Sequence, residues 1–204
     1  MVSTDTRVEN VEGGLELGSV SGEVSIRNVR DRLDLSSVSG EVEMRDVSGR
    51  TRATSVSGDI ECYRCEGQGS YQTVSGGVVL RNAAEDLKLE SVSGDIEVEA
   101  DRLVAVSGHS ISGDVDISGA LSGSGSGIVE FDTVSGNIHL RLADAPDARF
   151  NIHTGAGGSI RNRLTGHKPS RSKYARDESL KFVAGEGVAE VVLSTASGDI
   201  TLTD

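Results

Sequence analysis

Serine and threonine side chains recur at fixed places along the chain and are the first candidates for nucleophilic chemistry. The leading residues of the recurring motif are Ser19, Ser37, Ser55, Thr73, Ser91, Ser110, Thr133 and Thr195, and the residues two positions later are Ser21, Ser39, Ser57, Ser75, Ser93, Ser112, Ser135 and Ser197. A nucleophilic hydroxyl needs an activating base within hydrogen-bond reach, and only four histidines are available for these sixteen positions. We therefore expect corner hydroxyls that bond to local backbone or to the next repeat. A hydroxyl array that binds ice is the less favoured alternative.

Pairs of carboxylates follow the same motif and raise the question of a cation site. They are Glu41/Glu43, Asp59/Glu61, Asp95/Glu97 and Asp114/Asp116. Like charges on neighbouring strands repel each other, and a hard cation such as Ca²⁺ would relieve that repulsion. Solvation and cross-strand pairing with Arg27, Arg45 and Arg81 are the alternative. Because the chain has no dedicated calcium-loop motif, the sequence predicts no metal site and no cofactor.

The remaining reactive side chains do not form a recognisable constellation. A redox function for Cys62-Tyr63-Arg64-Cys65 would require a helix N-terminus, and a zinc site would require a second cysteine pair. We expect two buried apolar side chains here, with a disulfide as the alternative. The histidines His109, His139, His153 and His167 are scattered, and His139 is expected to be exposed. The sequence therefore predicts no catalytic residue and a protein that is not an enzyme.

The composition excludes several classes of protein. The chain has 204 residues and a net charge of −12, which disfavours binding to nucleic acid. It has no run of 18 apolar residues, so it offers no membrane insertion of its own. A hydrophobic content of 36% with 26 glycines suits a thin structure with a narrow apolar interior and many tight corners.

A single motif sets the period of the chain. Its glycines are Gly22, Gly40, Gly58, Gly76, Gly94, Gly113, Gly136 and Gly198, and the first four intervals between them are 18 residues each. A fixed period of this length indicates stacked copies of one small unit. Apolar positions from Leu15 onward step by 2, 3 and 4 residues, so that each repeat divides into two nine-residue halves.

This stepping predicts short strands with alternate residues inward and parallel neighbours about 4.8 Å apart. Two inward columns begin with Val24 and Ile26. The same pattern places a third set inward: Val20, Val38, Val56, Val74, Val92 and Val134. We expect an all-β chain forming a single parallel β-helix (β-solenoid), right-handed, with about 18 residues per coil.

The whole chain, residues 1–204, is expected to form one β-solenoid domain with two interruptions. A Gly/Ser insertion at 122–127 would bulge from a corner. A basic excursion at 161–182 precedes the closing coil, and we expect it to leave the stack as a solvated segment, or as a hairpin that covers the C-terminal end.

The motif copies Ser55–Ile60 and Ser91–Ile96 resemble those of the bacterial adhesin-type β-solenoid domain family, whose function is otherwise unknown. Phe150-Asn151-Ile152 and the closing Thr195–Leu202 also fit that family's layout, so the resemblance covers about residues 10–204. It implies a parallel β-helix on cell-envelope or secreted proteins, often behind a signal peptide or membrane anchor. It brings no catalytic residues.

These observations predict a non-enzymatic, adhesin-like structural or binding module whose partner is an unknown protein or surface ligand. Self-association, as a scaffold stacked end to end, is the alternative. A polysaccharide-active enzyme is less favoured, because the chain has no Trp, 3 Tyr and 3 Phe for sugar platforms. Met1–Asp5 lacks the features of a signal peptide. We therefore expect an envelope or secreted protein if a signal or anchor precedes this segment, and a cytoplasmic protein otherwise.

Overall fold

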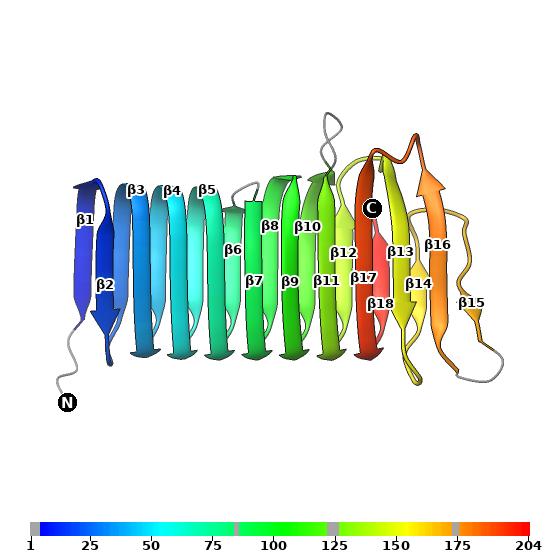
Figure 1. Cartoon of the computed structure of the whole chain (residues 1–204), viewed down its shortest axis with the longest axis horizontal. Helices are drawn as coiled ribbons and strands as arrows, with labels where there is room; N and C mark the ends of the chain where they lie inside the picture. Colours follow the sequence, from blue (N-terminus) through cyan, green and yellow to red (C-terminus); the bar gives the residue numbers. More distant parts are fainter. Residues whose placement is uncertain (1–4, 84–85, 122–126, 173–175) are drawn as a thin grey trace.

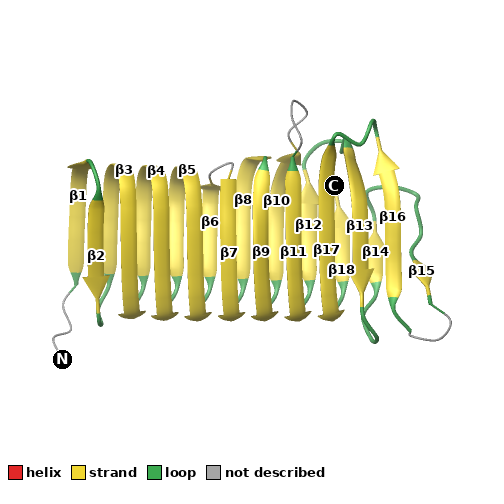
Figure 2. Ribbon diagram, viewed as in Figure 1, coloured by secondary structure: helices red, strands yellow, loops and turns green. Residues whose placement is uncertain are grey.

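The chain folds into two layers of strands that stand side by side along one axis (Figure 1). The computed structural model describes residues 5–83, 86–121, 127–172 and 176–204. Strands are the regular elements of this part of the chain, which contains no helix (Figure 2). Among these residues, therefore, no helix is long and apolar enough to cross a membrane. The all-β prediction is confirmed.

Strands β3, β4 and β5 each run through both layers, and shorter strands continue the two rows. The first layer contains β1 (Thr6–Glu12), the first halves of β3 (Val24–Ser39), β4 (Val42–Ser57) and β5 (Ile60–Ser75), then β6 (Val78–Ala83), β8 (Ile96–Leu103), β10 (Val115–Leu121), β12 (Ile138–Leu142), β18 (Ile200–Thr203) and β14 (Ile160–Asn162). The second layer contains β2 (Leu15–Ser19), the second halves of β3, β4 and β5, then β7 (Asp86–Ser93), β9 (Ala105–Ser112), β11 (Ile128–Ser135), β17 (Ala189–Ser197), β13 (Ala148–Thr154), β16 (Glu178–Ala184) and β15 (Ser170–Arg171).

The strand register follows the spacing of the motif. We call one pass of the chain through both layers a rung. Parallel pairing joins Val24 to Val42, Val42 to Ile60, and Ile60 to Val78. The two columns that begin at Val24 and Ile26 lie inside and are buried, as the sequence predicts. Their β-branched and aliphatic side chains therefore form the core that joins the two layers.

The third predicted inward column is wrong. Val20, Val38, Val56, Val74, Val92 and Val134 are all exposed, and the preceding serine or threonine points inward instead. The two nine-residue halves differ because the first half contains a residue with positive φ. These residues are Asn10, Asn28, Asp46, Arg64 and Asn82, with φ between 49° and 57°.

The conformation at this position decides which side chains point inward. The left-handed residue at Asp46 breaks the alternation between Met44 and Val47, so that both side chains face the interior. Nine residues later Ser55 lies in an uninterrupted strand, so the alternation continues and Val56 faces outward. Asn and Asp tolerate the left-handed conformation far better than Ser or Thr do.

The C-terminal strands are inserted within the stack. Strand β17 pairs in parallel with both β11 and β13, and β18 pairs with both β12 and β14. The final copy of the motif thus returns to register, as expected, but between two earlier rungs. Beyond it, β16 covers β13 in the antiparallel sense and buries Leu180 and Phe182.

The basic excursion at 161–182 is therefore partly a structural cover of this end and not only a solvated segment. The phenyl rings of Phe150 and Phe182 stack at 4.4 Å, and the His167 ring stacks on Phe182 at 4.8 Å. Residues 122–126 of the expected Gly/Ser insertion lie outside the described residues.

The glycine of the motif lets successive rungs approach each other closely. A Cβ atom at Gly40 would overlap the carbonyl oxygen of Gly22, and the same conflict recurs at Gly58, Gly76, Gly94, Gly113, Gly136 and Gly198 with the glycine of the neighbouring rung. The motif glycines therefore form a column in which a larger residue has no space.

We predict that Gly40→Ala lowers the free energy of unfolding by about 2–4 kcal/mol, because it adds this overlap to the strain of a positive φ. Gly13→Ala is the matched control, since Gly13 has φ +108° against +114° at Gly40 and no atom within 4 Å of the added Cβ. It should cost only about 1 kcal/mol. Equal losses in chemical denaturation would show that rung spacing is not the constraint.

Candidate functional site: the exposed valine ladder

The outward-facing residue of each motif forms a continuous apolar row, which we call the valine ladder. Its members share one position on successive strands of the second layer and expose between 43% and 58% of their surface. They are Val20, Val38, Val56, Val74, Val92, Ile111 and Val134. Large apolar side chains aligned in this way, rather than scattered singly, indicate an interaction surface.

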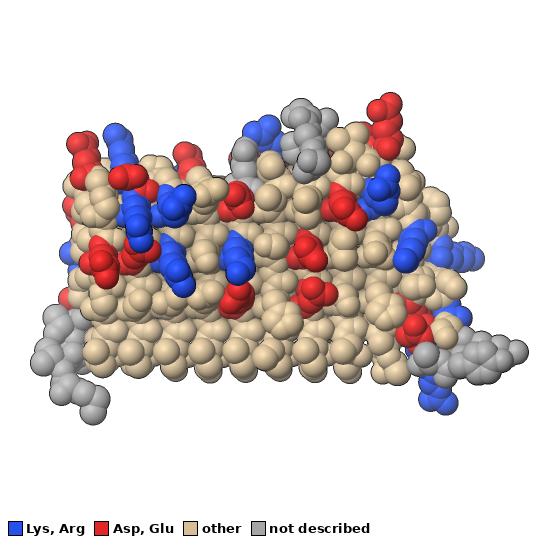
Figure 3. Space-filling view, viewed as in Figure 1, with Lys and Arg blue, Asp and Glu red and all other residues tan. Residues whose placement is uncertain are grey.

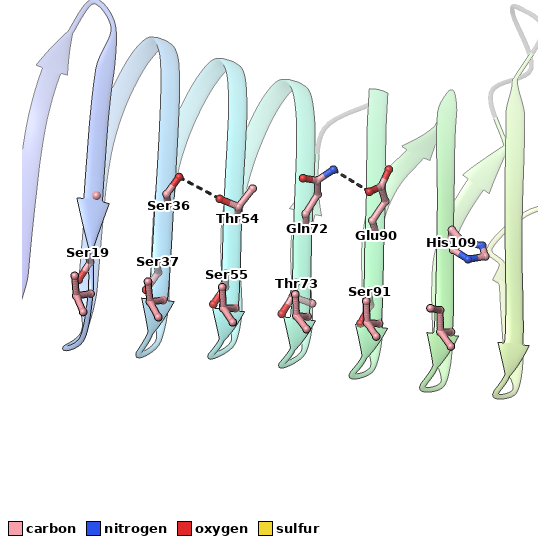
Figure 4. A pocket seen from close by; sticks show the side chains of 17 residues that line it. Ser19, Ser36, Ser37, Thr54, Ser55, Gln72, Thr73, Glu90, Ser91 and His109 are labelled. Atoms are coloured by element: carbon pink, nitrogen blue, oxygen red, sulfur yellow. Dashed lines mark hydrogen bonds between the residues drawn. The ribbon is translucent and has the colours of Figure 1, made fainter.

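A shallow groove of about 1060 Å³ runs along the ladder (Figure 4). Its other side is lined by the outward residues two positions earlier in each strand: Gly18, Ser36, Thr54, Gln72, Glu90 and His109. Thr54 Oγ1 donates to Ser36 Oγ at 3.2 Å, and Gln72 Nε2 donates to Glu90 Oε2 at 2.8 Å. The hydrogen bond from Lys88 to Glu90 lowers the pKa of that carboxyl. The groove thus has an apolar wall and a polar wall.

Along most of the stack, the lower edge of the face drawn in Figure 3 shows no charged side chain. Lys, Arg, Asp and Glu lie above this strip, and charged side chains reach the lower edge only at the right-hand end of the view. The strip corresponds to the ends of the second-layer strands, where the ladder lies. A partner that binds along the ladder meets apolar and hydroxyl groups there, and it meets the Glu90 carboxylate and the His109 imidazole on the polar wall beside it.

From Ser37 onward, the leading serine or threonine of each motif lies beneath the ladder and is buried. Ser91 Oγ donates to the Gly94 carbonyl at 3.1 Å, and Thr195 Oγ1 donates to the Gly136 carbonyl at 3.2 Å. In this column of leading residues, the buried hydroxyl oxygens without a hydrogen-bond partner among the described residues are those of Ser37, Ser55, Thr73, Ser110 and Thr133. The expectation of corner hydroxyls bonded to backbone therefore holds at only some positions. Their burial withdraws them from any external substrate.

The aspartates after the glycine accept hydrogen bonds from backbone N–H groups. The N–H of Gly77 donates to Asp59 Oδ1 at 2.7 Å, and the N–H of Asp114 donates to Asp95 Oδ1 at 2.8 Å. The outer members of the pairs meet cations, as in Arg45–Glu43 at 3.3 Å. Within the described residues no group of three or more His, Cys, Asp or Glu side chains could hold a metal ion. Asp59 and Asp95 therefore help to join successive rungs.

Cys62 and Cys65 are buried and joined by a disulfide. The sequence correctly places both side chains inside but favours free thiols over the bond. Arg64 has a φ of 55°, which turns the chain so that both cysteines face inward with Cα atoms 6.1 Å apart. That separation lies within the range a disulfide can span.

His139 is partly exposed on the first layer, in agreement with its predicted outward position. Its Nδ1 lies 3.2 Å from Asp116 Oδ1, and its Nε2 lies 3.3 Å from Thr203 Oγ1. Asp116 and His139 pair on the consecutive strands β10 and β12. Sequence reasoning missed the complete hydroxyl–imidazole–carboxylate chain, because only the late insertion of β18 beside β12 brings Thr203 to His139.

A family model matches residues 1–125, and by this match the chain belongs to the Toastrack DUF4097 family, a β-rich family of unknown function. No curated protein matches the chain. No solved structure matches it. The family is of unknown function, so it assigns no role to the valine ladder.

We predict that Thr73→Val leaves the free energy of unfolding unchanged or raises it by up to about 1 kcal/mol, because it removes a buried hydroxyl that lacks a partner. Thr195→Val makes the same change where the hydroxyl donates to Gly136, and it should cost about 1 kcal/mol. Equal effects in urea denaturation would contradict this distinction.

A second prediction concerns pH. Burial, followed by repulsion from Glu61, Glu23 and other neighbouring carboxylates, raises the pKa of Glu41. The folded chain therefore holds this proton more tightly than the unfolded chain, and it loses stability as pH rises from the ordinary glutamate pKa through the raised value. Glu41→Gln should raise the Tm by about 1–2 °C at neutral pH, and the difference should disappear below about pH 4.

The control for this prediction is Glu90→Gln, which removes a carboxylate whose pKa the hydrogen bond from Lys88 lowers. Scanning calorimetry at both pH values should show no rise in the Tm for this variant. A gain that persists unchanged in acid would show that Glu41 acts through packing and not through its charge.

Proposed function

We propose that this protein is a non-catalytic structural and binding module, and that the valine ladder is its binding surface. The observation that carries the proposal is the alignment of seven half-exposed apolar side chains along an uncharged strip. Burying such a row against a partner is favourable in proportion to the apolar area removed from water. The finer architecture we propose is a single right-handed β-solenoid of 18 residues per coil.

A rigid frame supports this role. Backbone hydrogen bonds run from rung to rung at the corners, as in Val42 N–H to the Asp59 carbonyl at 2.9 Å and Ile60 N–H to the Gly77 carbonyl at 2.9 Å. Side chains on these hydrogen-bonded strands keep fixed positions, so the binding surface loses little conformational freedom when a partner binds. The partner would be a protein or another surface ligand with an extended apolar strip.

The compartment is part of the proposal. A buried disulfide between Cys62 and Cys65 supports an oxidising environment, such as the cell envelope or the exterior. Adhesin-like binding at a cell surface is consistent with that location. We expect mass spectrometry of the natively produced protein, alkylated before reduction, to find both cysteines protected. Free thiols in that sample would argue for a cytoplasmic protein.

Stacking into an open fibre is less well supported. Strand β16 runs antiparallel to β13 and ends the series of parallel strand pairs at one end of the stack. At the other end Val11, Leu15 and Leu17 remain only partly buried, so that end could meet a second copy. Copies of the chain that contact each other through this one end alone form dimers and not a fibre.

The experiment that tests the binding surface uses a fluorescent apolar dye as the probe. We predict that the folded protein enhances bis-ANS fluorescence, and that Val56→Ser and Val74→Ser together remove most of the enhancement. Val183→Ser is the matched control, because Val183 is also about half exposed (50%) but lies on β16, away from the ladder. Equal losses in both variants would contradict a specific surface at the ladder.

The proposal that the protein is not an enzyme can be challenged at His139. An imidazole between a hydroxyl and a carboxylate is the arrangement that activates a nucleophile. We expect no hydrolysis of p-nitrophenyl esters above the level of His139→Ala. Turnover that requires both His139 and Thr203 would overturn the non-catalytic assignment.

A further inference from the structure

We propose that the occupant of the valine ladder is a second copy of this chain, so that two stacks associate side by side through their uncharged strips. This inference rests on the proposed binding surface and names its partner. Three properties of the strip support a second copy: its periodicity, its lack of charge and its area.

The first property is periodicity. Ladder residues repeat at the spacing of parallel strands, about 4.8 Å. The motif glycines keep that spacing, because Gly40, Gly58 and their equivalents each approach the carbonyl of the neighbouring rung too closely to admit a Cβ. A second ladder has the same spacing, so the two can interdigitate at every rung. A partner with any other repeat would match at only a few rungs.

The second property is charge. Two copies that each carry a net charge of −12 repel each other over most of their surfaces. The ladder itself brings no charge to a contact between two copies (Figure 3), and the carboxylate beside it in the groove, Glu90, is paired with Lys88 at 2.8 Å, which offsets its charge. The acid after each motif glycine lies past the corner, where Asp59 and Asp95 accept backbone hydrogen bonds. Self-association is thus directed to this edge.

The third property is area. Seven apolar side chains that are about half exposed offer about 500 Å² per copy, or about 1,000 Å² in total, which is close to the lower limit for a specific interface. The column of Ser36, Thr54 and Gln72 beside the ladder can supply a polar rim. Because this area is at the lower limit, we expect a reversible dimer that dissociates on dilution.

Sedimentation velocity of the full chain, over about a hundredfold range of concentration, tests the dimer. We expect a monomer at the lowest concentrations and a dimer at the highest. Val74→Glu, in the middle of the ladder, should keep the protein monomeric throughout, because each dimer would bury two carboxylates in an apolar seam. Val183→Glu, on the exposed face of β16, should dimerise like the unchanged protein.

Circular dichroism and the Tm establish that both variants are folded before their masses are compared. A monomer at every concentration of the unchanged protein would overturn the dimer. So would a dimer that Val74→Glu leaves intact. In either case bis-ANS binding that still depends on Val56 and Val74 would preserve the binding surface with another partner, so the two proposals fail separately.

A crosslinking experiment locates the contact. Val74 is the fourth of the seven ladder residues, so it meets its own counterpart whether the two stacks run in the same or in opposite directions. Under mild oxidation Val74→Cys should form a covalent dimer at concentrations where the unchanged protein associates. Val183→Cys is the matched control and should remain monomeric. Crosslinking at Val183 but not at Val74 would place the interface elsewhere.

Discussion

The close approach of one rung to the next at the motif glycines is the constraint on which the rest of the structure depends. At Gly40 and its equivalents the carbonyl of the neighbouring rung occupies the place where a side chain would begin. Each rung therefore superimposes on its neighbour, and every other position of the repeat becomes a straight column. The buried valine and isoleucine columns, the aspartates that accept backbone hydrogen bonds, and the exposed ladder all follow from that superposition.

Because the rungs superimpose, the residue type at one position of the repeat determines the character of a whole column on the surface. One outward valine on a surface needs no explanation, but seven in register make an apolar strip along the stack. The same repetition keeps charge out of that strip and gathers it on the other columns (Figure 3). A protein with this surface is suited to binding along an edge, and the copies of its own chain are the partners whose spacing matches at every rung.

Much of the fold could be predicted from the sequence, and the errors have identifiable causes. The inward columns at Val24 and Ile26 follow from the repeat and are confirmed. The repeat predicts Val56 inward, and this prediction is wrong because the two half-repeats are not equivalent. The difference is visible in the sequence, because Asp46 and Asn82 stand in the first half-repeat where Ser55 and Ser91 stand in the second. Asn and Asp accept a positive φ more readily than Ser and Thr do, and this distinguishes the two halves. The candidate binding surface was missed through this one error.

The sequence by itself determined the period, the all-β class and the identity of the columns, because strand alternation and glycine corners are local properties. Only the tertiary structure decided the order of the last rungs. The insertion of β17 and β18 between earlier strands joins residues 62 positions apart, such as Ile138 and Ile200. Any strand with the motif could pair at several places in the stack. The place that such a strand takes depends on the strands on both sides of it, including the antiparallel pair of β13 and β16. Those neighbours exist only in the assembled fold.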